Sequence, residues 1–506
     1  MALSFSQKYK AKFSWEGFAV GAILLLGFVL RLRQYLIGRS LWLDEAMLTL
    51  NIVNRDFLGL FQPLDYDQGA PIGFLLIEKI INILFGEHEF VLRLFPFAVG
   101  VAALGLFYLL LRRTISGVGL LAGLALFAVS PELIYYSAEV KQYILDVAVT
   151  IILLYLTYPL LSKKPEKRNY VYLIVAGILV LWFSHAALFV LAGIGFGLLI
   201  QALQRRKRSE LNTVLTLGVT WLADLGLLYV VSLRHLTQNK FLREYWQENF
   251  IPVPPWADWK WFGYSFSGML QDQIGITVSA WLVFIIIVLG FISLYLKNKT
   301  YAGILLAIFF FTSVASTLWL YPLGGRFSLF MVPVVIILIS QSLGALAQRL
   351  NAQQAWGTLV ALLVVAYFLY APASESLTDF ISPKYYEHIR PSMAALSENW
   401  QKGDALFVSN GAVPAFRFYA ERYGLGEVTY RSSDVSDYLE PGKILSSLEP
   451  LDGGARVWVL ITHVYEKNSF NEKDYLLNYL DTIGNKKREF PSAGTSVYLF
   501  LYDLGQ

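Results

Sequence analysis

The chain has 506 residues, of which 56% are hydrophobic and only 15% are charged, and its mean hydropathy is +0.51. This composition excludes a soluble globular protein and is typical of a multi-span membrane protein. The small net charge of +4 and the absence of cysteine exclude a nucleic-acid-binding surface, disulfides, cysteine-ligated metal and thiol catalysis.

Eleven stretches have the length and apolar content of transmembrane helices, which need about 20 mostly apolar residues. They are 15–36, 92–111, 116–135, 143–161, 170–183, 185–203, 212–233, 276–296, 300–320, 327–346 and 355–372. The first stretch follows Lys8, Lys10 and Lys12 and has no small-residue cleavage site after it. We therefore expect an uncleaved first span and not a removed signal peptide.

A twelfth apolar stretch, 71–85, is short and carries Glu78 and Lys79 at its centre. An unpaired charge at the middle of a bilayer costs roughly 2.5–3.5 kcal/mol, so an interfacial or re-entrant helix is expected there. Eleven spans also place the basic clusters 162–168 and 204–208 on the same side as the N-terminus. The positive-inside rule assigns that side to the cytosol.

Residues 373–506 differ in character from the rest of the chain. Alternation and β-branched content predict three strands, interleaved with helices, within DALFVSN (404–410), RVWVLITHV (456–464) and TSVYLFLYDL (495–504). We therefore expect an all-α membrane bundle over 1–372, with outer loops 37–91 and 234–275. A small α/β domain over 373–506 would follow the eleventh span on the outer side.

Two adjacent acids, Asp44 and Glu45, occur among large apolar residues in LWLDEAML (41–48). One interpretation is structural: Asp44 caps a helix that begins at Glu45. The functional interpretation is a general base at the membrane surface, with a carboxylate partly shielded by its apolar neighbours. The two roles are compatible.

A second polar group lies in YYSAEVKQYILD (135–146), where Glu139, Lys141 and Tyr143 alternate just before a span. The structural interpretation is a solvated collar whose tyrosines belong to the interfacial aromatic belt. The functional interpretation is an anion site, because Lys141 lies near carboxylates on the predicted outer face.

Two further candidates lie at predicted outer turns. Arg326 follows a Gly-Gly pair in YPLGGRFSLF (321–330), and its planar guanidinium matches a phosphate, although snorkelling toward lipid headgroups explains it equally well. His185 lies in WFSHAALFVLAG (182–193), and a lone histidine is more often structural than a ligand.

The long loop 234–275 is rich in basic and aromatic residues, among them Lys240, Arg243 and Trp246. Such residues anchor proteins at a membrane interface, and aromatic rings also stack on sugar rings. A loop of this length tends to be functional, so we include these three residues as candidates for substrate binding.

In this order, LWLDEA, the stretch 67–100, SPELIYYSAEVKQYILD, WFSHAALFVLAG and YPLGGRFSLFMVP resemble the bacterial integral-membrane glycosyltransferases of the GT-C fold. These are RgtA/B/C/D-like relatives of protein O-mannosyltransferases and of the aminoarabinose transferase. The resemblance covers roughly residues 15–345. It implies a polyprenyl-phosphate sugar donor, an inverting transfer outside the cytosol, a bacterial inner-membrane location, and an acceptor that is an envelope glycan, a lipid or a protein.

The resemblance also implies roles for single residues. The first-loop acid of the family falls on Asp44 as base, with Glu45 as its neighbour. Glu139 matches the second-loop acid, and Lys141 and Tyr143 follow it in the same pattern. Many relatives have arginine at the position of Lys141, and lysine lacks its bidentate geometry.

Arg326 is our candidate for the donor phosphate. Some relatives use a divalent metal, and carboxylates such as Asp44 and Glu139 would suit Mg²⁺ or Mn²⁺.

Two other classes of function compete with a transferase. A lipid or polysaccharide flippase would carry charges or helix breaks inside its spans, and Asp224 is the clearest intramembrane acid. A non-catalytic scaffold of envelope polysaccharide assembly would not depend on a carboxylate at Asp44. The clustering of the charges on one predicted face favours the transferase.

Overall fold

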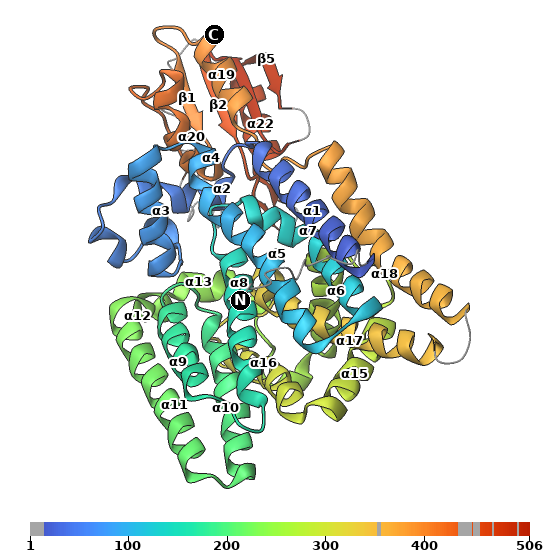
Figure 1. Ribbon diagram of the computed structural model, residues 1–506. Helices are drawn as coiled ribbons and strands as arrows, with labels where there is room; N and C mark the ends of the chain where they lie inside the picture. Colours follow the sequence, from blue (N-terminus) through green and yellow to red (C-terminus); the bar gives the residue numbers. More distant parts are fainter. Residues whose placement is uncertain are drawn as a thin grey trace, which may run out of the picture. The chain divides into compact units, whose positions relative to one another are not determined.

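The computed structural model describes residues 15–351, 356–433, 448, 456–467, 470–492 and 495–505. Two compact units make up the chain (Figure 1). Unit 1 consists of residues 1–35, 71–74 and 94–381, and unit 2 consists of residues 36–70, 75–93 and 382–506. The predicted domain boundary after residue 372 stays a prediction, as does the cytosolic N-terminus, whose Lys8, Lys10 and Lys12 lie outside the described residues.

Unit 1 is a bundle of apolar helices. Its long helices are α1 (Trp15–Leu36), α5 (Leu94–Thr114), α6 (Gly117–Val129), α8 (Tyr143–Thr157), α9 (Lys167–Leu181), α10 (Ala187–Arg205), α11 (Arg208–Leu228), α15 (Ala280–Lys297), α16 (Lys299–Thr317), α17 (Val332–Asn351) and α18 (Trp356–Ile381). Helices α9, α10 and α11 lie side by side (Figure 1). The protein is therefore a multi-pass membrane protein.

Within the described residues, nine helices are long and apolar enough to cross a membrane, or ten if the bent pair 117–138 is one span. These ten correspond to ten of the eleven stretches expected from the sequence. The other stretch, 170–183, lies largely in α9, which has 15 residues. At about 1.5 Å per residue α9 is roughly 22 Å long, which is short of a hydrocarbon core of about 30 Å.

Small residues allow the helices of unit 1 to pack closely. A side chain at Gly290 of α15 would begin 1.9 Å from the Leu338 carbonyl oxygen of α17. At Gly123 of α6 the Cβ would lie 2.0 Å from the Ser340 hydroxyl, also on α17. Backbones approach this closely where lipid-embedded helices gain stability from packing and not from water exclusion.

Helix α3 (Ile72–Phe85) contains the charges that argued against a twelfth span. It has 14 residues and is not among the membrane-crossing candidates of the described chain. Lys79 donates to the Val53 carbonyl at 2.9 Å. Glu78 is fully buried, and within the described chain neither of its carboxylate oxygens has a hydrogen-bond partner. Burial raises the pKa of Glu78 well above its usual value.

We expect Glu78→Gln to stabilise the protein at pH 8. The unfolded chain loses the Glu78 proton above about pH 4.5 while the folded chain retains it, so folded stability falls as pH rises from there. Glutamine has no proton to lose, so its advantage should shrink toward pH 4. Unfolding temperatures at several pH values would test this, with the exposed Glu87→Gln as the matched control. A pH-independent difference between Glu78→Gln and the native protein would contradict the expectation.

Unit 2 contains a four-stranded sheet in the order β1-β2-β6-β5. Strands β1 (Ala405–Val408) and β2 (Arg456–Ile461) are parallel, and β6 (Tyr498–Asp503) is antiparallel to both β2 and β5 (Asn485–Pro491). In register, Phe407 pairs with Val459 and Val459 with Phe500. Strands β1, β2 and β6 lie in the three predicted stretches, so the predicted fold class is confirmed.

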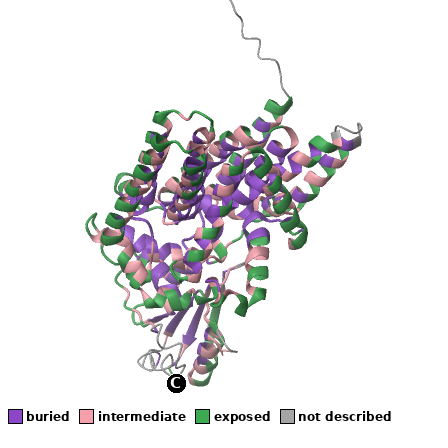
Figure 2. Cartoon of the chain, turned by 90° about the horizontal axis from the view of Figure 1, so that it is seen from below, coloured by how far each residue is buried: buried purple, intermediate pink, exposed green. Residues whose placement is uncertain are grey.

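The sheet of unit 2 is covered on both faces. Helix α22 (Glu472–Ile483) contributes Leu476 and Leu480 to a core with Val459 and Phe500, and α19 (Arg390–Asn399) packs against β5 and β6. Figure 2 accordingly shows buried residues along the strands. Two short strands, β3 (Glu466–Lys467) and β4 (Phe470–Asn471), form a separate pair.

Strand β5 was missing from the sequence prediction because NKKREFP is mostly charged and shows no apolar alternation. Its place in the sheet explains the charge. β5 is an edge strand, and charged side chains on an edge prevent pairing with other chains.

Candidate active site

Asp44 lies half-buried in the first turn of α2 (Leu43–Asn54), in unit 2. The helix begins two residues before the start expected from the sequence, and its N-cap residue, Trp42, makes no side-chain capping bond. The Leu43 amide instead donates to Glu387 Oε2 at 2.8 Å. Glu387 thus fills the capping role that the sequence suggested for Asp44.

Glu387 also connects this helix start to His463. Its other carboxylate oxygen lies 2.7 Å from Nδ1 of the imidazole. The hydrogen bond to Glu387 raises the pKa of His463, burial opposes this, and the negative charges of Glu387, Asp44 and Glu472 raise it further. Asp44 therefore lies close to a cationic imidazole at acidic pH.

Glu45 is fully buried and forms a bidentate pair with Arg93. The Arg93 Nε and Nη2 atoms donate to the two Glu45 oxygens at 2.9 and 2.6 Å. Arg93 also donates to the carbonyls of Arg39 and Ser40 at 2.7 and 3.3 Å. Both Glu45 oxygens are thus engaged in holding the segment before α2 in place, and the predicted catalytic role of Glu45 stays a prediction.

We expect Arg93→Met to lower the free energy of unfolding by about 3–5 kcal/mol, because it leaves the Glu45 carboxylate buried without its cation. Denaturant titration of the purified protein would measure the loss. The control is Arg168→Met, which removes a solvent-exposed pair with Glu166 and should cost about 1 kcal/mol or less. The double change Glu45→Met and Arg93→Met should recover part of the loss, and equal costs for Arg93→Met and Arg168→Met would contradict a structural role for the pair.

The C-terminal part of unit 2 anchors the segment around α2 at a second point. Glu89, at the start of α4 (Glu89–Leu92), accepts from the Tyr419 hydroxyl at 2.8 Å. Arg422 and Arg390 lie 3.2 and 3.4 Å from the same carboxylate. The Tyr419 hydroxyl in turn accepts from the Leu41 amide at 2.9 Å. Through Tyr419, helix α20 (Val413–Tyr419) therefore contacts the chain both before α2, at Leu41, and after it, at Glu89.

In unit 1, Arg326 lies among aromatic rings. Its guanidinium carbon lies 5.3 Å from the Tyr143 ring centre, 5.2 Å from that of Trp246 and 5.9 Å from that of Phe327. The Phe327 ring also contacts Tyr143 and Trp246, at centroid distances of 6.0 and 4.9 Å. Three candidates from distant sequence positions, Arg326, Tyr143 and Trp246, thus meet around Phe327. We call these four residues the Arg326 cluster. Cation–π contacts fix the position of the guanidinium while its charge persists.

Glu139 and Lys141 lie just before α8, next to Tyr143 in sequence. Glu139 is fully buried and Lys141 is nearly so. The Glu139 backbone is extended, and its carbonyl accepts from the Lys141 amide at 2.7 Å. This burial is inconsistent with the solvated collar considered as the structural alternative.

The other candidates of unit 1 have different surroundings. Lys240 and Arg243 are exposed on α13 (Lys240–Tyr245), and Arg243 donates to the Thr237 carbonyl at 2.6 Å. The Nε2 atom of His185 is enclosed without a partner in the described chain, and burial lowers the pKa of His185 to about 4. The intramembrane acid Asp224 accepts from the Trp182 indole at 3.1 Å.

Comparison with known proteins addresses the fold. No curated protein sequence matches the chain. The family described as dolichyl-phosphate-mannose-protein mannosyltransferase matches residues 69–229, which is less than half of the chain.

Two solved structures resemble nearly all of it. ArnT from Cupriavidus metallidurans bound to undecaprenyl phosphate is 13% identical, with a TM-score of 0.53, over 96% of this chain and 98% of that one. The oligosaccharyltransferase AglB from Archaeoglobus fulgidus, in complex with an inhibitory peptide and a dolichol-phosphate, is 14% identical, with a TM-score of 0.54, over 97% of this chain and 75% of that one.

The chain has the GT-C fold of integral-membrane glycosyltransferases. This confirms the fold expected from the ordered motifs, which the sequence placed in loops around the spans. At these identities the GT-C likeness concerns the fold, and the roles of single residues rest on their own surroundings.

Metal binding was a further expectation from the resemblance. Another solved AglB structure of Archaeoglobus fulgidus, 13% identical with a TM-score of 0.52, is a complex with Zn and sulfate. Within the described part of this GT-C chain, no group of three or more histidine, aspartate or glutamate side chains is arranged to hold a metal ion. Asp44 and Glu139, the ligands suggested by the sequence, belong to different units. We therefore derive no step through a metal.

Sequence reasoning missed Glu387 and His463. Glu387 lies in KYYEHIR (384–390), a polar and aromatic stretch directly after α18, and His463 follows β2. The only local signal was the density of ionisable residues beside apolar elements. Their link to α2 depends on contacts across more than 300 positions, which no local pattern encodes.

Proposed function

We propose that this protein is a glycosyltransferase that moves a sugar from a polyprenyl-phosphate donor to an extracytoplasmic acceptor. The acceptor is an envelope glycan, a lipid or a protein. The reaction takes place at the outer face of a bacterial inner membrane. The transfer is inverting, since one displacement at the anomeric carbon suffices.

In this proposal Asp44 is the base. The acceptor hydroxyl forms a bond to the anomeric carbon, the bond between that carbon and the donor phosphate oxygen breaks, and the hydroxyl proton passes to the Asp44 carboxylate. The polyprenyl phosphate leaves as an anion and needs no proton. It needs positive charge, which Arg326 supplies, with Lys141 as a second cation.

The remaining candidates have supporting roles. Tyr143 and Trp246 hold Arg326 through their rings. Glu139 is a second buried acid beside Lys141, and Glu45 positions α2 through Arg93. Lys240 and Arg243 are exposed, so we assign them to the membrane surface or to an incoming acceptor. His185 is neutral at pH 7 and is assigned to substrate contact without a charge.

The observation that carries the proposal is the shared fold. Two transferases of this fold contain a polyprenyl phosphate in their solved structures, and each likeness extends over nearly all of this chain. The Arg326 cluster adds a cation whose charge is permanent and whose position is fixed. Asp224, the clearest intramembrane acid, accepts a hydrogen bond from the Trp182 indole. It therefore has a structural partner and does not favour a flippase.

Release of polyprenyl phosphate would test the proposal. Purified protein in lipid nanodiscs would be incubated with a panel of polyprenyl-phosphate sugars and with envelope extract as the source of acceptor. Release from one donor, dependent on the extract, is expected and would identify the sugar. Donor movement across the bilayer without release would favour the flippase, and neither release nor movement would favour the scaffold.

The proposed orientation makes a separate prediction. The chain contains no cysteine, so single cysteines are unambiguous reporters. Leu58, between α2 and α3, is 77% exposed, and Lys164 is exposed between α8 and α9. In intact cells Leu58→Cys should react with a membrane-impermeant maleimide, and Lys164→Cys should react only after lysis. The opposite pattern would reverse the orientation.

A further inference from the structure

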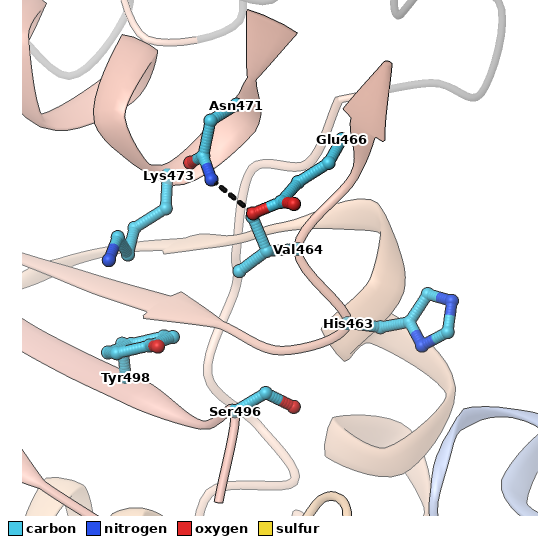
Figure 3. Close-up of a pocket in the computed structure, with 7 residues that line it drawn as sticks. All are labelled: His463, Val464, Glu466, Asn471, Lys473, Ser496 and Tyr498. Carbon is cyan, nitrogen blue, oxygen red and sulfur yellow. Dashed lines mark hydrogen bonds between the residues drawn. The ribbon is translucent and has the colours of Figure 1, made fainter. Parts of the chain in front are cut away.

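Unit 2 contains a polar cavity of about 270 Å³ (Figure 3). Its walls come from the end of β2, from the β3–β4 pair, from α22 and from the start of β6. The lining residues are His463, Val464, Glu466, Asn471, Lys473, Ser496 and Tyr498. No candidate from the sequence lies among them. The volume is near the lower end of the range for small-molecule sites, which suits a ligand of one ring.

The charges of the side chains that line this cavity nearly cancel. Lys473 lies 4.5 Å above the Tyr498 ring centre, and the Asn471 amide donates to Glu466 at 2.5 Å. Figure 3 shows Lys473 over Tyr498, whereas the His463 imidazole points away from the other groups. One ammonium and one carboxylate leave little net charge, so the cavity does not select an anion or a cation.

The same lining provides several kinds of hydrogen-bonding group beside one aromatic face. The ammonium donates, the carboxylate accepts, and the Asn471 amide keeps one N–H beyond its bond to Glu466. The Ser496 hydroxyl accepts, because its own proton goes to the Tyr386 carbonyl. A neutral ligand with many hydroxyl groups can use these groups, and once the flexible Lys473 side chain moves off the Tyr498 ring, the C–H face of such a ligand can rest on that ring. These requirements describe a sugar ring.

A short segment joins the wall of this cavity to the helix that carries Asp44. The amide and the hydroxyl of Ser496 both donate to the Tyr386 carbonyl, at 3.2 and 3.0 Å. The next residue, Glu387, accepts from the Leu43 amide at the start of α2 and contacts His463. His463 is itself a lining residue, so the cavity and the start of α2 share two connections.

We propose that this cavity binds a sugar unit of the acceptor glycan and that Tyr386 and Glu387 couple its occupancy to α2. The inference rests on the proposed function and makes it more specific, because it assigns the acceptor to the carbohydrate class. Tyr498 supplies the stacking face. Lys473, Glu466 and Asn471 form hydrogen bonds with the hydroxyl groups of the sugar. Glu387 is a positioning residue for Asp44.

Binding can be measured without any donor. Saturation-transfer NMR on the full-length protein in nanodiscs would be recorded with methyl glycosides of glucose, galactose, mannose and N-acetylglucosamine. At least one glycoside should receive saturation from the native protein. Tyr498→Ala should weaken its binding by about tenfold through loss of the ring face. Tyr498→Phe, which keeps the ring, should bind nearly as well as the native protein.

Matched lysine changes control for surface charge. Lys473→Met should weaken glycoside binding, whereas Lys487→Met, on the exposed strand β5, should not. Absence of saturation transfer to every glycoside, or equal transfer in the native protein and Tyr498→Ala, would overturn the carbohydrate site. Either result would leave release of polyprenyl phosphate unaffected, so it is distinguishable from failure of the proposed function.

The acceptor role has its own readout. With the transfer assay running, Tyr498→Ala should raise the KM for acceptor about tenfold and leave kcat nearly unchanged. A fall in kcat with an unchanged KM would indicate a structural role and overturn the assignment to acceptor binding. Glycoside binding in a protein that releases no polyprenyl phosphate from any donor would also overturn it, while the carbohydrate site itself would stand.

Discussion

Asp44→Asn should reduce sugar transfer by about 10²–10⁴-fold, the range typical for loss of a general base. Asparagine preserves the shape of the side chain but cannot accept the proton of the acceptor hydroxyl. Polyprenyl phosphate release with saturating donor and acceptor would measure the loss. Because the change is nearly isosteric and the helix start is capped by Glu387, the unfolding temperature should remain within a few degrees of the native value.

The control for this experiment is Asp56→Asn, in the same outer segment. Asp56 is exposed and accepts from the Gly59 amide at 2.7 Å, a bond that asparagine can still make. Activity of Asp56→Asn should equal that of the native protein. If Asp44→Asn transferred sugar at the native rate, Asp44 would not be the base.

Arg326→Gln should lower the rate of transfer by about 10²–10³-fold, as expected for loss of a group that stabilises charge developing on the leaving phosphate. Arg326→Lys keeps the charge but loses the planar guanidinium that contacts Tyr143, Trp246 and Phe327, so we expect an intermediate rate. The effect should fall on kcat and kcat/KM together, since the added charge on the phosphate exists only in the transition state.

Arg168→Gln provides the matched control, because Arg168 is an exposed arginine of the same unit whose partner is the exposed Glu166. It should alter transfer by less than about threefold, in line with the small effects of exposed charges. Equal losses for Arg168→Gln and Arg326→Gln would point to a general electrostatic effect and would remove the specific assignment of Arg326.

Sequence reasoning was most accurate where local patterns decide structure. Long apolar runs predicted the spans, and apolar alternation predicted β1, β2 and β6. It was less accurate where contacts between segments distant in sequence decide the structure. Strand β5 is charged because it is an edge of the sheet. Its place in the sheet cannot be read from composition alone.

The candidate site shows the same division. Asp44, Glu139 and Arg326 were selected because charges beside apolar spans are costly unless they have a role. The partners of these residues were not predicted. The bond between Leu43 and Glu387 spans 344 positions, and the aromatic rings around Arg326 come from three separate segments. Such pairings have no sequence period, so only the folded structure reveals them.

The link between the first loop and the end of the chain also has a consequence for biosynthesis. Leu41 and its partner Tyr419 are 378 positions apart. At about 5–20 residues per second, a ribosome needs roughly 20–80 s to travel that distance. During this interval the nascent helix α2 has its Glu45–Arg93 pair but lacks Glu387, Tyr419 and the four-stranded sheet of unit 2. A chain truncated by a premature stop after the last span would retain all of its membrane helices, but α2 would lack its contacts with the C-terminal part of unit 2. We expect cellular proteases to degrade such a chain.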